Sequence, residues 1–299
     1  MRCSRTGANL ALCVLLAGLS SGQQPKHDRE FWRAIAKHHY DVPGGESASS
    51  LAHELSGFLG EADPELRDDL AYSILERWIY RGVLNADDLR KLADEWAANL
   101  KDGIGGSGTN SVLKRSFSAL CLSSIAERDV KAPFLGESRY HSLVAAALVY
   151  LQAERDLRGY DAQLGWVHAT AHTSDLLQAL ANNPLLTANE EARILDGIAV
   201  RLASAPDVYS QGEQDRVAQA VVAVIRREDF KPDVFEDWLA RLKDEDEKTW
   251  AEPLTSQSLA RYQNHTYMLQ ALAVRLELEP DSPKIAAWRQ QLLTLLKTR

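Results

Sequence analysis

Two histidines and an aspartate lie at spacings that would bring them to one face of a helix. His168, His172 and Asp175 are separated by four and three residues, so at about 100° per residue they share one stripe. Two imidazoles one turn apart can chelate a divalent cation such as zinc, and a carboxylate can complete the set of ligands. A metal held there could polarise a substrate or lower the pKa of a bound water. One hypothesis is therefore a metal-dependent hydrolase.

The same stripe also fits a structural role. It lacks the adjacent glutamate of the HExxH metalloprotease pattern. A histidine followed by an aspartate three residues on can be a hydrogen-bonded pair on a helix surface. The nearby Leu176, Leu177 and Leu180 indicate that much of this helix is core. Packing is thus the competing interpretation of the three residues.

A polar segment just before the stripe is a second candidate site. Arg158 could clamp a carboxylate or phosphate with two hydrogen bonds, and Tyr160 and Trp166 could line a pocket. The alternative is an internal network of ion pairs that fixes two helix ends, with the rings packed between helices. Ser116, on an earlier helix, has no evident base beside it. The candidate ligand-binding residues are Arg158, Tyr160, Asp156, Asp161, Trp166 and Arg115.

Helices must position both candidate sites, because helical periodicity covers nearly everything after Asp28. Apolar residues recur three and four positions apart, as in Ile194, Leu195, Ile198 and Leu202. Capping residues, or proline at the first helical position, mark where helices begin. These signals occur at Asp63-Pro64, Thr187 to Glu190, Ser210 to Glu213, Lys231-Pro232 and Ser282-Pro283.

The predicted helices fall into consecutive pairs that begin about 43 to 54 residues apart, which is the rhythm of HEAT or armadillo repeats. We therefore expect an all-α, armadillo- or HEAT-like α-α superhelix of stacked hairpins over 61–299, preceded by a helical cap over 23–60. An irregular helical bundle and an α/α toroid are the alternatives. The predicted pairs are 64–81 with 85–98, 109–127 with 138–153, 163–180 with 188–205, 211–227 with 231–244, and 254–277 with 281–297.

The first 22 residues have the pattern of a secretory signal peptide. Arg2 and Arg5 form a positive region, Leu10 to Gly18 is a short apolar run, and small residues precede Gln23. The pattern predicts a periplasmic or secreted protein, with a retained N-terminal anchor as the alternative. The apolar run is shorter than the roughly 20 residues of a membrane-spanning helix. No other segment suits a membrane span, so we expect none after cleavage.

Composition limits the classes of partner. The formal net charge is −8 and no basic run is present, so the chain has no electrostatic footprint for nucleic acid. The glycine-rich stretch 103–109 lacks the lysine and preceding strand of a phosphate-binding loop, which favours a flexible connection. Cys121 is the one thiol left after signal cleavage, and its apolar helical context predicts a buried, inert side chain.

Four stretches of the chain have distinctive residue patterns, namely Arg67–Tyr72, Lys114–Leu120, Glu154–Asp161 and Gly165–Leu177. In order and spacing they resemble a bacterial family of unknown function, DUF2785, over about residues 55–245. Val167 and Thr170 are small departures that leave the histidine pair intact. The resemblance implies an all-helical, armadillo-like fold. It brings no established activity, so it assigns no catalytic role to any residue.

Two functional hypotheses follow, and whether the protein is an enzyme is left open. The first is an exported binding or scaffold protein that takes an unknown protein or small-molecule ligand on the concave face of the stack, near the cluster at 155–175. The second is the metal-dependent hydrolase, with His168, His172 and Asp175 as ligands. They differ in whether the cluster side chains converge on a cavity or are used in helix packing.

Overall fold

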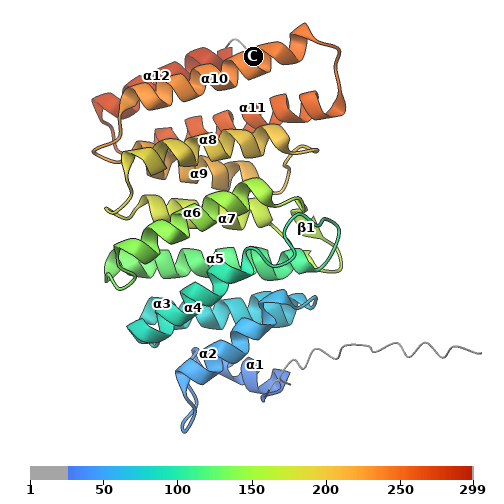
Figure 1. Ribbon diagram of the computed structural model, residues 1–299, viewed down its shortest axis with the longest axis vertical. Helices are drawn as coiled ribbons and strands as arrows, with labels where there is room; N and C mark the ends of the chain where they lie inside the picture. The colour runs from blue at the N-terminus through green and yellow to red at the C-terminus, as the bar shows by residue number, and fades with distance from the viewer. Residues whose placement is uncertain (1–25, 298–299) are drawn as a thin grey trace, which may run out of the picture.

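The computed structural model describes residues 26–297 as a stack of paired helices (Figure 1). The predicted signal segment 1–22, with Cys3 and Cys13, lies outside the described residues. A 3-10 turn, η1 (Phe58–Gly60), follows α2, and a π-helix, η2 (Glu65–Tyr72), leads directly into α3. The α-helices are α1 (Arg29–Lys37), α2 (Ala48–Gly57), α3 (Ser73–Arg81), α4 (Ala86–Asn99), α5 (Ser111–Lys131), α6 (Glu137–Ala153), α7 (Ala169–Ala181), α8 (Ala188–Ser204), α9 (Glu213–Ile225), α10 (Pro232–Ala251), α11 (Ser256–Leu278) and α12 (Pro283–Lys297).

The helices alternate between two layers. The first helices of successive pairs pack on one another, α5 on α7, α7 on α9 and α9 on α11, while α4 contacts α6, α6 contacts α8 and α8 contacts α10. Figure 1 places α1 and α2 at one end of the stack and α10 and α12 at the other. The all-α class is confirmed, whereas the armadillo- or HEAT-like superhelix of stacked hairpins stays a prediction.

Most of the predicted helix starts are confirmed. The capping box at Thr187, the proline at the first position of α10 and the Ser282 cap of α12 are all present. The capping box predicted at Ser210 is wrong. Gly212, at a φ of 97°, precedes α9, and the Glu213 carboxylate accepts from the Gln211 N–H at 2.9 Å. A capping box would require this carboxylate to accept from the backbone N–H of Ser210, one residue earlier in the chain.

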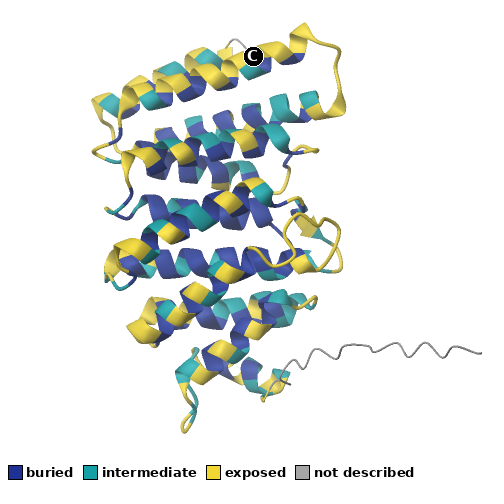
Figure 2. Cartoon of the chain, in the orientation of Figure 1, coloured by how far each residue is buried: buried dark blue, intermediate teal, exposed yellow. Residues whose placement is uncertain are grey.

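Helix α7 is the most enclosed part of the fold. Eleven of its thirteen residues are buried, because α5 covers one side and α9 the other (Figure 2). Buried polar groups normally have hydrogen-bond partners, so the polar residues of α7 must find theirs on these neighbours. None of the helices described in residues 26–297 is long and apolar enough to cross a lipid bilayer.

A small β-hairpin stands where the sequence predicted the start of a helix. Strands β1 (Tyr160–Asp161) and β2 (Gly165–Trp166) pair antiparallel, with Tyr160 opposite Trp166. The predicted helix over 163–180 is therefore wrong at its start, and α7 begins at Ala169. Asp161 is the local reason, because its Oδ1 accepts from the backbone N–H groups of Gln163 and Leu164 at 2.8 and 3.0 Å. Such side-chain bonds compete with a helical start.

Candidate functional site

The hairpin and its flanking residues, 154–168, lie at one edge of the stack beside the N-terminal ends of α5, α7 and α9 (Figure 1). We call this region the hairpin edge. It contains six of the nine candidate residues of the sequence analysis, and Arg115, His172 and Asp175 lie on the adjoining helices. The structure shows what each of those side chains contacts.

Gly159 fixes how closely the hairpin edge approaches α9. A Cβ atom at this position would lie 1.9 Å from Oε1 of Gln211 and 2.4 Å from Oε1 of Glu213. Gln211 Oε1 also accepts a hydrogen bond from the backbone N–H of Tyr160. Only glycine permits this contact without displacing the two side chains.

Arg67 holds the hairpin from the opposite side. Its side chain is fully buried and donates to the backbone oxygens of Glu61, Leu164 and Trp166 at 2.7, 2.5 and 3.3 Å. Its guanidinium also lies 4.7 Å from the centre of the Phe117 ring. Arg67 belongs to the π-helix η2, a type of turn often found at functional sites. This arginine therefore fixes the conformation of the hairpin.

Arg115 forms a buried ion pair with Glu154. Its Nε lies 2.6 Å from Oε2 and its Nη2 lies 3.1 Å from Oε1 of the carboxylate, and the two side chains are 0% and 3% exposed. Arg115 also donates to the backbone oxygen of Asp102 at 2.8 Å. These contacts join α5 to the segment after α6, as in the alternative interpretation of an internal network, and the ligand contact of Arg115 stays a prediction.

Asp156 and Arg158 form a second, internal pair. The Asp156 carboxylate accepts from Nε and Nη2 of Arg158 at 2.9 and 2.7 Å and from the backbone N–H of Gly108 at 2.9 Å. Arg158 also donates to the backbone oxygen of Thr109 at 3.1 Å, and its Nη1 lies 3.7 Å from Asp161. The pair fastens the glycine-rich connection to the hairpin edge. This arrangement agrees with the alternative interpretation, a network that fixes helix ends.

His168 lies just outside α7, so the predicted single helical stripe is wrong. Its backbone is left-handed, with φ 47° and ψ 32°, because its N–H and that of Val167 both donate to the Gly159 carbonyl. Its Nε2 lies 3.1 Å from the backbone oxygen of Gln211. A carbonyl only accepts, so Nε2 carries the proton. Burial lowers the pKa of His168, an effect that the Glu213 carboxylate, 3.7 Å away, opposes.

His172 is paired with Ser116 inside the stack. Its Nδ1 lies 2.8 Å from Ser116 Oγ, and the Ser116 hydroxyl donates to the backbone oxygen of Val167. Since that hydroxyl has one proton, Nδ1 of His172 must be the donor to Oγ. Burial lowers the pKa of His172 well below its ordinary value of 6.5. The serine is fully buried, so the pair joins α5 to α7 and holds no exposed nucleophile.

Asp175 completes the predicted ligand set but points to another partner. Its Oδ2 lies 2.5 Å from Nη1 of Arg216 on α9, and burial raises the pKa of the carboxyl group. His168, His172 and Asp175 therefore each bond to a different protein group. In the part of the chain that the structure describes, no three His, Cys, Asp or Glu side chains are grouped so that they could hold a metal ion. The geometry gives the zinc hypothesis no donor set.

Two aromatic rings are among the exposed residues of the hairpin edge. Tyr160 is 52% and Trp166 is 42% exposed, with ring centroids 5.0 Å apart at 74°. Trp166 also stacks on His168, at 4.3 Å and 26°. The alternative interpretation, in which these rings pack between helices, is wrong, because the hairpin carries them out of the helix layers. We call Tyr160 and Trp166 the aromatic pair.

Several residues that build the hairpin edge were not among the sequence candidates. They are Arg67, Glu154, Gln211 and Glu213. The first two belong to stretches that carry the family resemblance, which is the signal that could have identified them. Glu213 was expected only as part of the capping signal at Ser210 to Glu213, and it does occupy the first turn of α9. Gln211 has no signal in the sequence, because its role depends on the contact with Gly159.

Comparisons with known proteins identify a family without a described activity. A family model described as "Protein of unknown function (DUF2785)" matches residues 100–274. The match covers α5 to α10 and most of α11, and so includes the hairpin edge. No curated protein and no solved structure matches the chain.

Proposed function

The chain belongs to the DUF2785 family, and we propose that it is a binding or scaffold protein that uses the aromatic pair to recognise its ligand. One observation carries this proposal: Tyr160 and Trp166 are exposed on a hairpin whose backbone is otherwise fixed. Exposed aromatic rings in a rigid setting are typical of binding sites, because little conformational entropy is lost when they contact a ligand.

The rigidity of the support favours recognition. Arg67 bonds to both β2 and the turn before it, while Gln211 accepts from β1. His168 stacks on Trp166 and is itself bonded to the backbone oxygen of Gln211, just before α9. The rings are therefore pre-organised, and a ligand with a flat apolar face could stack on them. Behind the rings, Arg67 anchors β2 and Gln211 anchors β1.

The polar residues near the aromatic pair are bonded to other parts of the chain, which favours binding over catalysis. Arg67, Arg115 and Asp156 are buried and bonded to other parts of the chain. His172 and Ser116 bond to each other in the core. A general base must lie within hydrogen-bond reach of the substrate proton that it accepts, and these groups are instead bonded within the fold. The metal-dependent hydrolase is accordingly not proposed.

We also propose that the protein acts outside the cytoplasm, in the periplasm or as a secreted protein. The support for this is the sequence pattern of residues 1–22 alone. Determination of the mature N-terminus by mass spectrometry, after expression in a host with a signal peptidase, tests it. A mature chain that starts near Gln23 would support export, and an intact Met1 in the soluble cytosolic fraction would contradict it.

The binding proposal is tested by screening saccharide and peptide arrays with the wild type and with Trp166→Ala. Removing a central tryptophan should weaken binding of any true ligand by tenfold or more, as expected for a loss of about 2 kcal/mol. The chain offers a matched control, because Trp250 is 57% exposed and lies edge-on to Tyr262 at 5.1 Å, far along the sequence on α10. Trp250→Ala should bind like the wild type.

Two outcomes would overturn the binding proposal. A ligand that binds Trp166→Ala and the wild type equally would show that the aromatic pair is not the recognition site. Turnover of a hydrolase substrate that is lost in a folded His172→Ala variant would favour catalysis. Elemental mass spectrometry of the purified wild type, beside His168→Ala/His172→Ala, adds an independent measurement of bound metal.

A further inference from the structure

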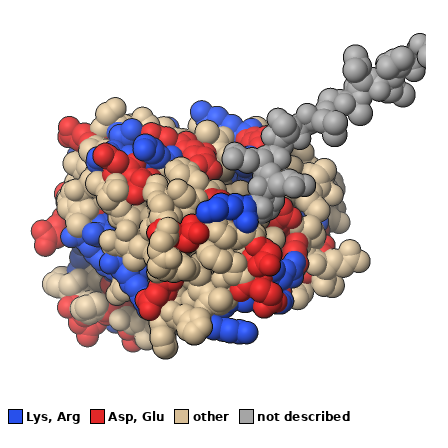
Figure 3. Space-filling view, turned by 90° about the horizontal axis from the view of Figure 1, so that it is seen from below, with Lys and Arg blue, Asp and Glu red and all other residues tan. Residues whose placement is uncertain are grey.

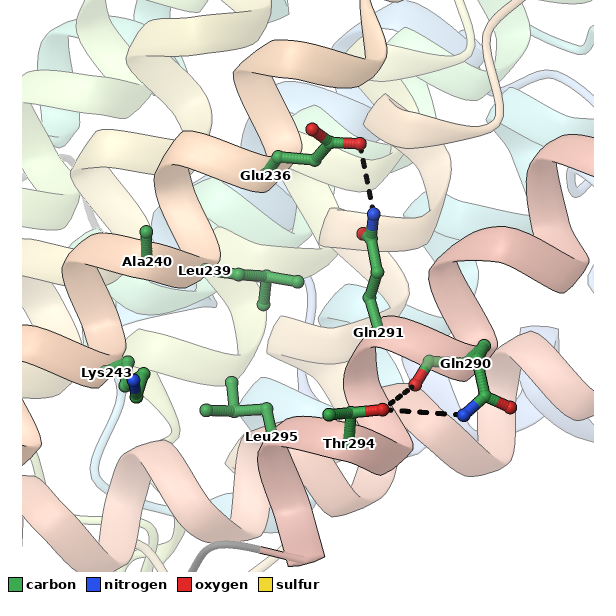
Figure 4. A pocket seen from close by; sticks show the side chains of 8 residues that line it. All are labelled: Glu236, Leu239, Ala240, Lys243, Gln290, Gln291, Thr294 and Leu295. Atoms are coloured by element: carbon green, nitrogen blue, oxygen red, sulfur yellow. Dashed lines mark hydrogen bonds between the residues drawn. The ribbon is translucent and has the colours of Figure 1, made fainter.

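The two ends of the stack carry ordinary surface groups. At the α1–α2 end, acidic and basic side chains are interspersed over the face (Figure 3). At the other end a groove of about 450 Å³ lies between α10 and α12, where Gln291 Nε2 donates to Glu236 at 3.0 Å (Figure 4). The chemically distinctive feature lies between these ends, in the glycine-rich connection from α4 to α5, residues 100–110. It is a pair of adjacent residues rather than a pocket.

The glycine-rich connection contains the pair Asp102-Gly103. Every residue from Lys101 to Ser111 is exposed, and the Asp102 side chain is 62% exposed. Gly103 has a left-handed φ of 63°, which glycine adopts without strain. Aspartate side chains readily approach the backbone that follows them, and a glycine at the next position has no Cβ atom to obstruct that approach. The carboxyl carbon of Asp102 is therefore accessible to the amide nitrogen of Gly103.

The amide of Gly103 is available for reaction. Within residues 26–297 its N–H donates to no acceptor, whereas the amides of Asp102, Ile104 and Gly106 donate to nearby carbonyls at 3.0, 3.3 and 3.4 Å. Attack of the free nitrogen on the Asp102 carboxyl carbon would close a five-membered succinimide ring. Since the connection is exposed, water could then open this ring at either of its two carbonyls.

Arg115 distinguishes the two carbonyls of such a ring. Its Nη1 donates to the main-chain oxygen of Asp102 at 2.8 Å, and its side chain is fully buried. A fixed cation at this place stabilises the negative charge that develops when water attacks the main-chain carbonyl. Lys114 lies 3.1 Å from the carboxylate Oδ2 of Asp102, but it is 44% exposed, so solvent weakens its effect. Hydrolysis is therefore favoured at the main-chain carbonyl.

From this arrangement we propose that Asp102 is a modification site, which converts to isoaspartate without an enzyme. The Gly103 nitrogen gives up its proton and bonds to Cγ of Asp102, and one carboxyl oxygen leaves as water. A second water then breaks the bond between the ring nitrogen and the main-chain carbonyl carbon, and the nitrogen regains a proton. One water is released and one is taken up, so the reaction is an isomerisation that needs no oxidant and no cofactor.

Isoaspartate would change how the connection is anchored. The main chain would be one carbon longer, and the oxygen that accepts from Arg115 would belong to a free carboxylate. Arg115 already pairs with Glu154 at 2.6 Å, so it would then lie between two acids. The connection is also bonded to the hairpin edge, through the Gly108 N–H and Asp156. Ageing at Asp102 is thus expected to loosen one support of the hairpin edge.

The experiment is incubation of the purified protein in oxygen-18 water at neutral pH for several weeks. Each passage through the ring adds one oxygen-18 atom to the residue. Digestion in ordinary water and peptide mass spectrometry then locate the label, and electron-transfer fragmentation separates isoaspartate from aspartate. Label should accumulate at Asp102, mostly as isoaspartate. Asp102→Glu keeps the charge opposite Lys114 and should remove both signals, because a ring with one more carbon closes more slowly.

The chain contains a matched control, because the same two residues occur as Asp196-Gly197 inside α8. The Asp196 side chain is 48% exposed, but Gly197 is buried and its N–H belongs to the helical ladder. Ring closure there requires the helix to open, so label at Asp196 should be at least about tenfold lower than at Asp102 in the folded protein. In urea the two positions should be labelled equally.

Two outcomes would overturn the proposal. Equal labelling at Asp102 and Asp196 in the folded protein, or none at Asp102, would show that the connection is not a modification site. A ratio of isoaspartate to aspartate at position 102 that is the same in the folded protein and in urea would contradict the role of Arg115. The aromatic pair takes no part in this chemistry, so the result is independent of ligand binding.

Discussion

Gly159 and Gln211 are in such close contact that a Cβ atom on the glycine would lie 1.9 Å from the glutamine Oε1. The glutamine is bonded in turn to the backbone N–H of Tyr160. One contact between segments 52 positions apart in the chain therefore sets the distance between the hairpin edge and α9. The position of the aromatic pair depends on it.

Substitution of Gly159 by alanine should destabilise the protein. The new methyl group must displace Gln211 and the buried Glu213, and overpacking of this kind costs about 1–3 kcal/mol. Urea unfolding followed by circular dichroism measures the loss. Gly57→Ala is the matched control, because a Cβ there meets nothing within 4 Å and the residue is helical. The control should be neutral or more stable by about 0.5 kcal/mol, and equal losses in both variants would contradict the close contact.

Arg67→Ala should be among the most destabilising single changes at the hairpin edge. It leaves the backbone oxygens of Glu61 and Leu164 without their donor, and a buried charged network of this type loses about 3 kcal/mol when one member is removed. Arg77, 51% exposed and 3.9 Å from Glu76, provides the control, with an expected loss below about 0.5 kcal/mol for Arg77→Ala. Chemical unfolding at pH 7 compares the two. Similar values would mean that Arg67 is not a structural anchor.

Acid should destabilise the fold through His172. Burial holds the pKa of His172 well below 6.5 in the folded protein, so below pH 6.5 the unfolded chain binds a proton that the folded chain does not. Stability is therefore fully present above pH 6.5 and falls as the pH drops towards the folded pKa, by up to about 1.4 kcal/mol per pH unit. Replacing His172 by glutamine removes this contribution, so the difference in unfolding free energy between the two proteins should shrink from pH 7 to pH 5. A constant difference over that range would contradict the prediction.

Cys121 should be unreactive in the folded protein. Its side chain is 1% exposed, and burial raises the pKa of the thiol well above its ordinary value of 9.0. Reagents therefore cannot reach the sulfur, and the reactive thiolate form is not populated. Alkylation by iodoacetamide should be on the order of 100-fold slower in the native state than in urea. Peptide mass spectrometry follows Cys121 separately from any other cysteine. Rapid native labelling would place this thiol at the surface.

The helices could be predicted from the sequence because their signals are local. Periodicity and capping residues lie within a few positions of each helix end, so the predicted bounds of most helices are close to the observed ones. Helix α10 is an exception, because it extends to Ala251, beyond the predicted end at 244. The structural interpretation of Asp156 and Arg158 was also available, since the two residues are neighbours in sequence and bond to each other.

The hairpin edge could not be predicted, because distant contacts determine it. His168 was assigned to a helical stripe, yet the Gly159 carbonyl holds it in a left-handed conformation. The partner of Ser116 could not be seen either, because His172, which donates to its hydroxyl oxygen, lies 56 residues away in the sequence. Arg67 contacts a carbonyl 97 residues further along the chain. No pattern within a single helix contains such information.

The long reach of Arg67 has a consequence for how the molecule unfolds. In a simple stack each helix pair contacts only its neighbours, so pairs can open one at a time from either end. Here η2, in the first of the five predicted pairs, is bonded directly to the hairpin before α7 in the third. Gln211, just before α9 in the fourth pair, is bonded to the same hairpin. The middle of the stack is therefore expected to melt as a single cooperative block, with fraying confined to its two ends.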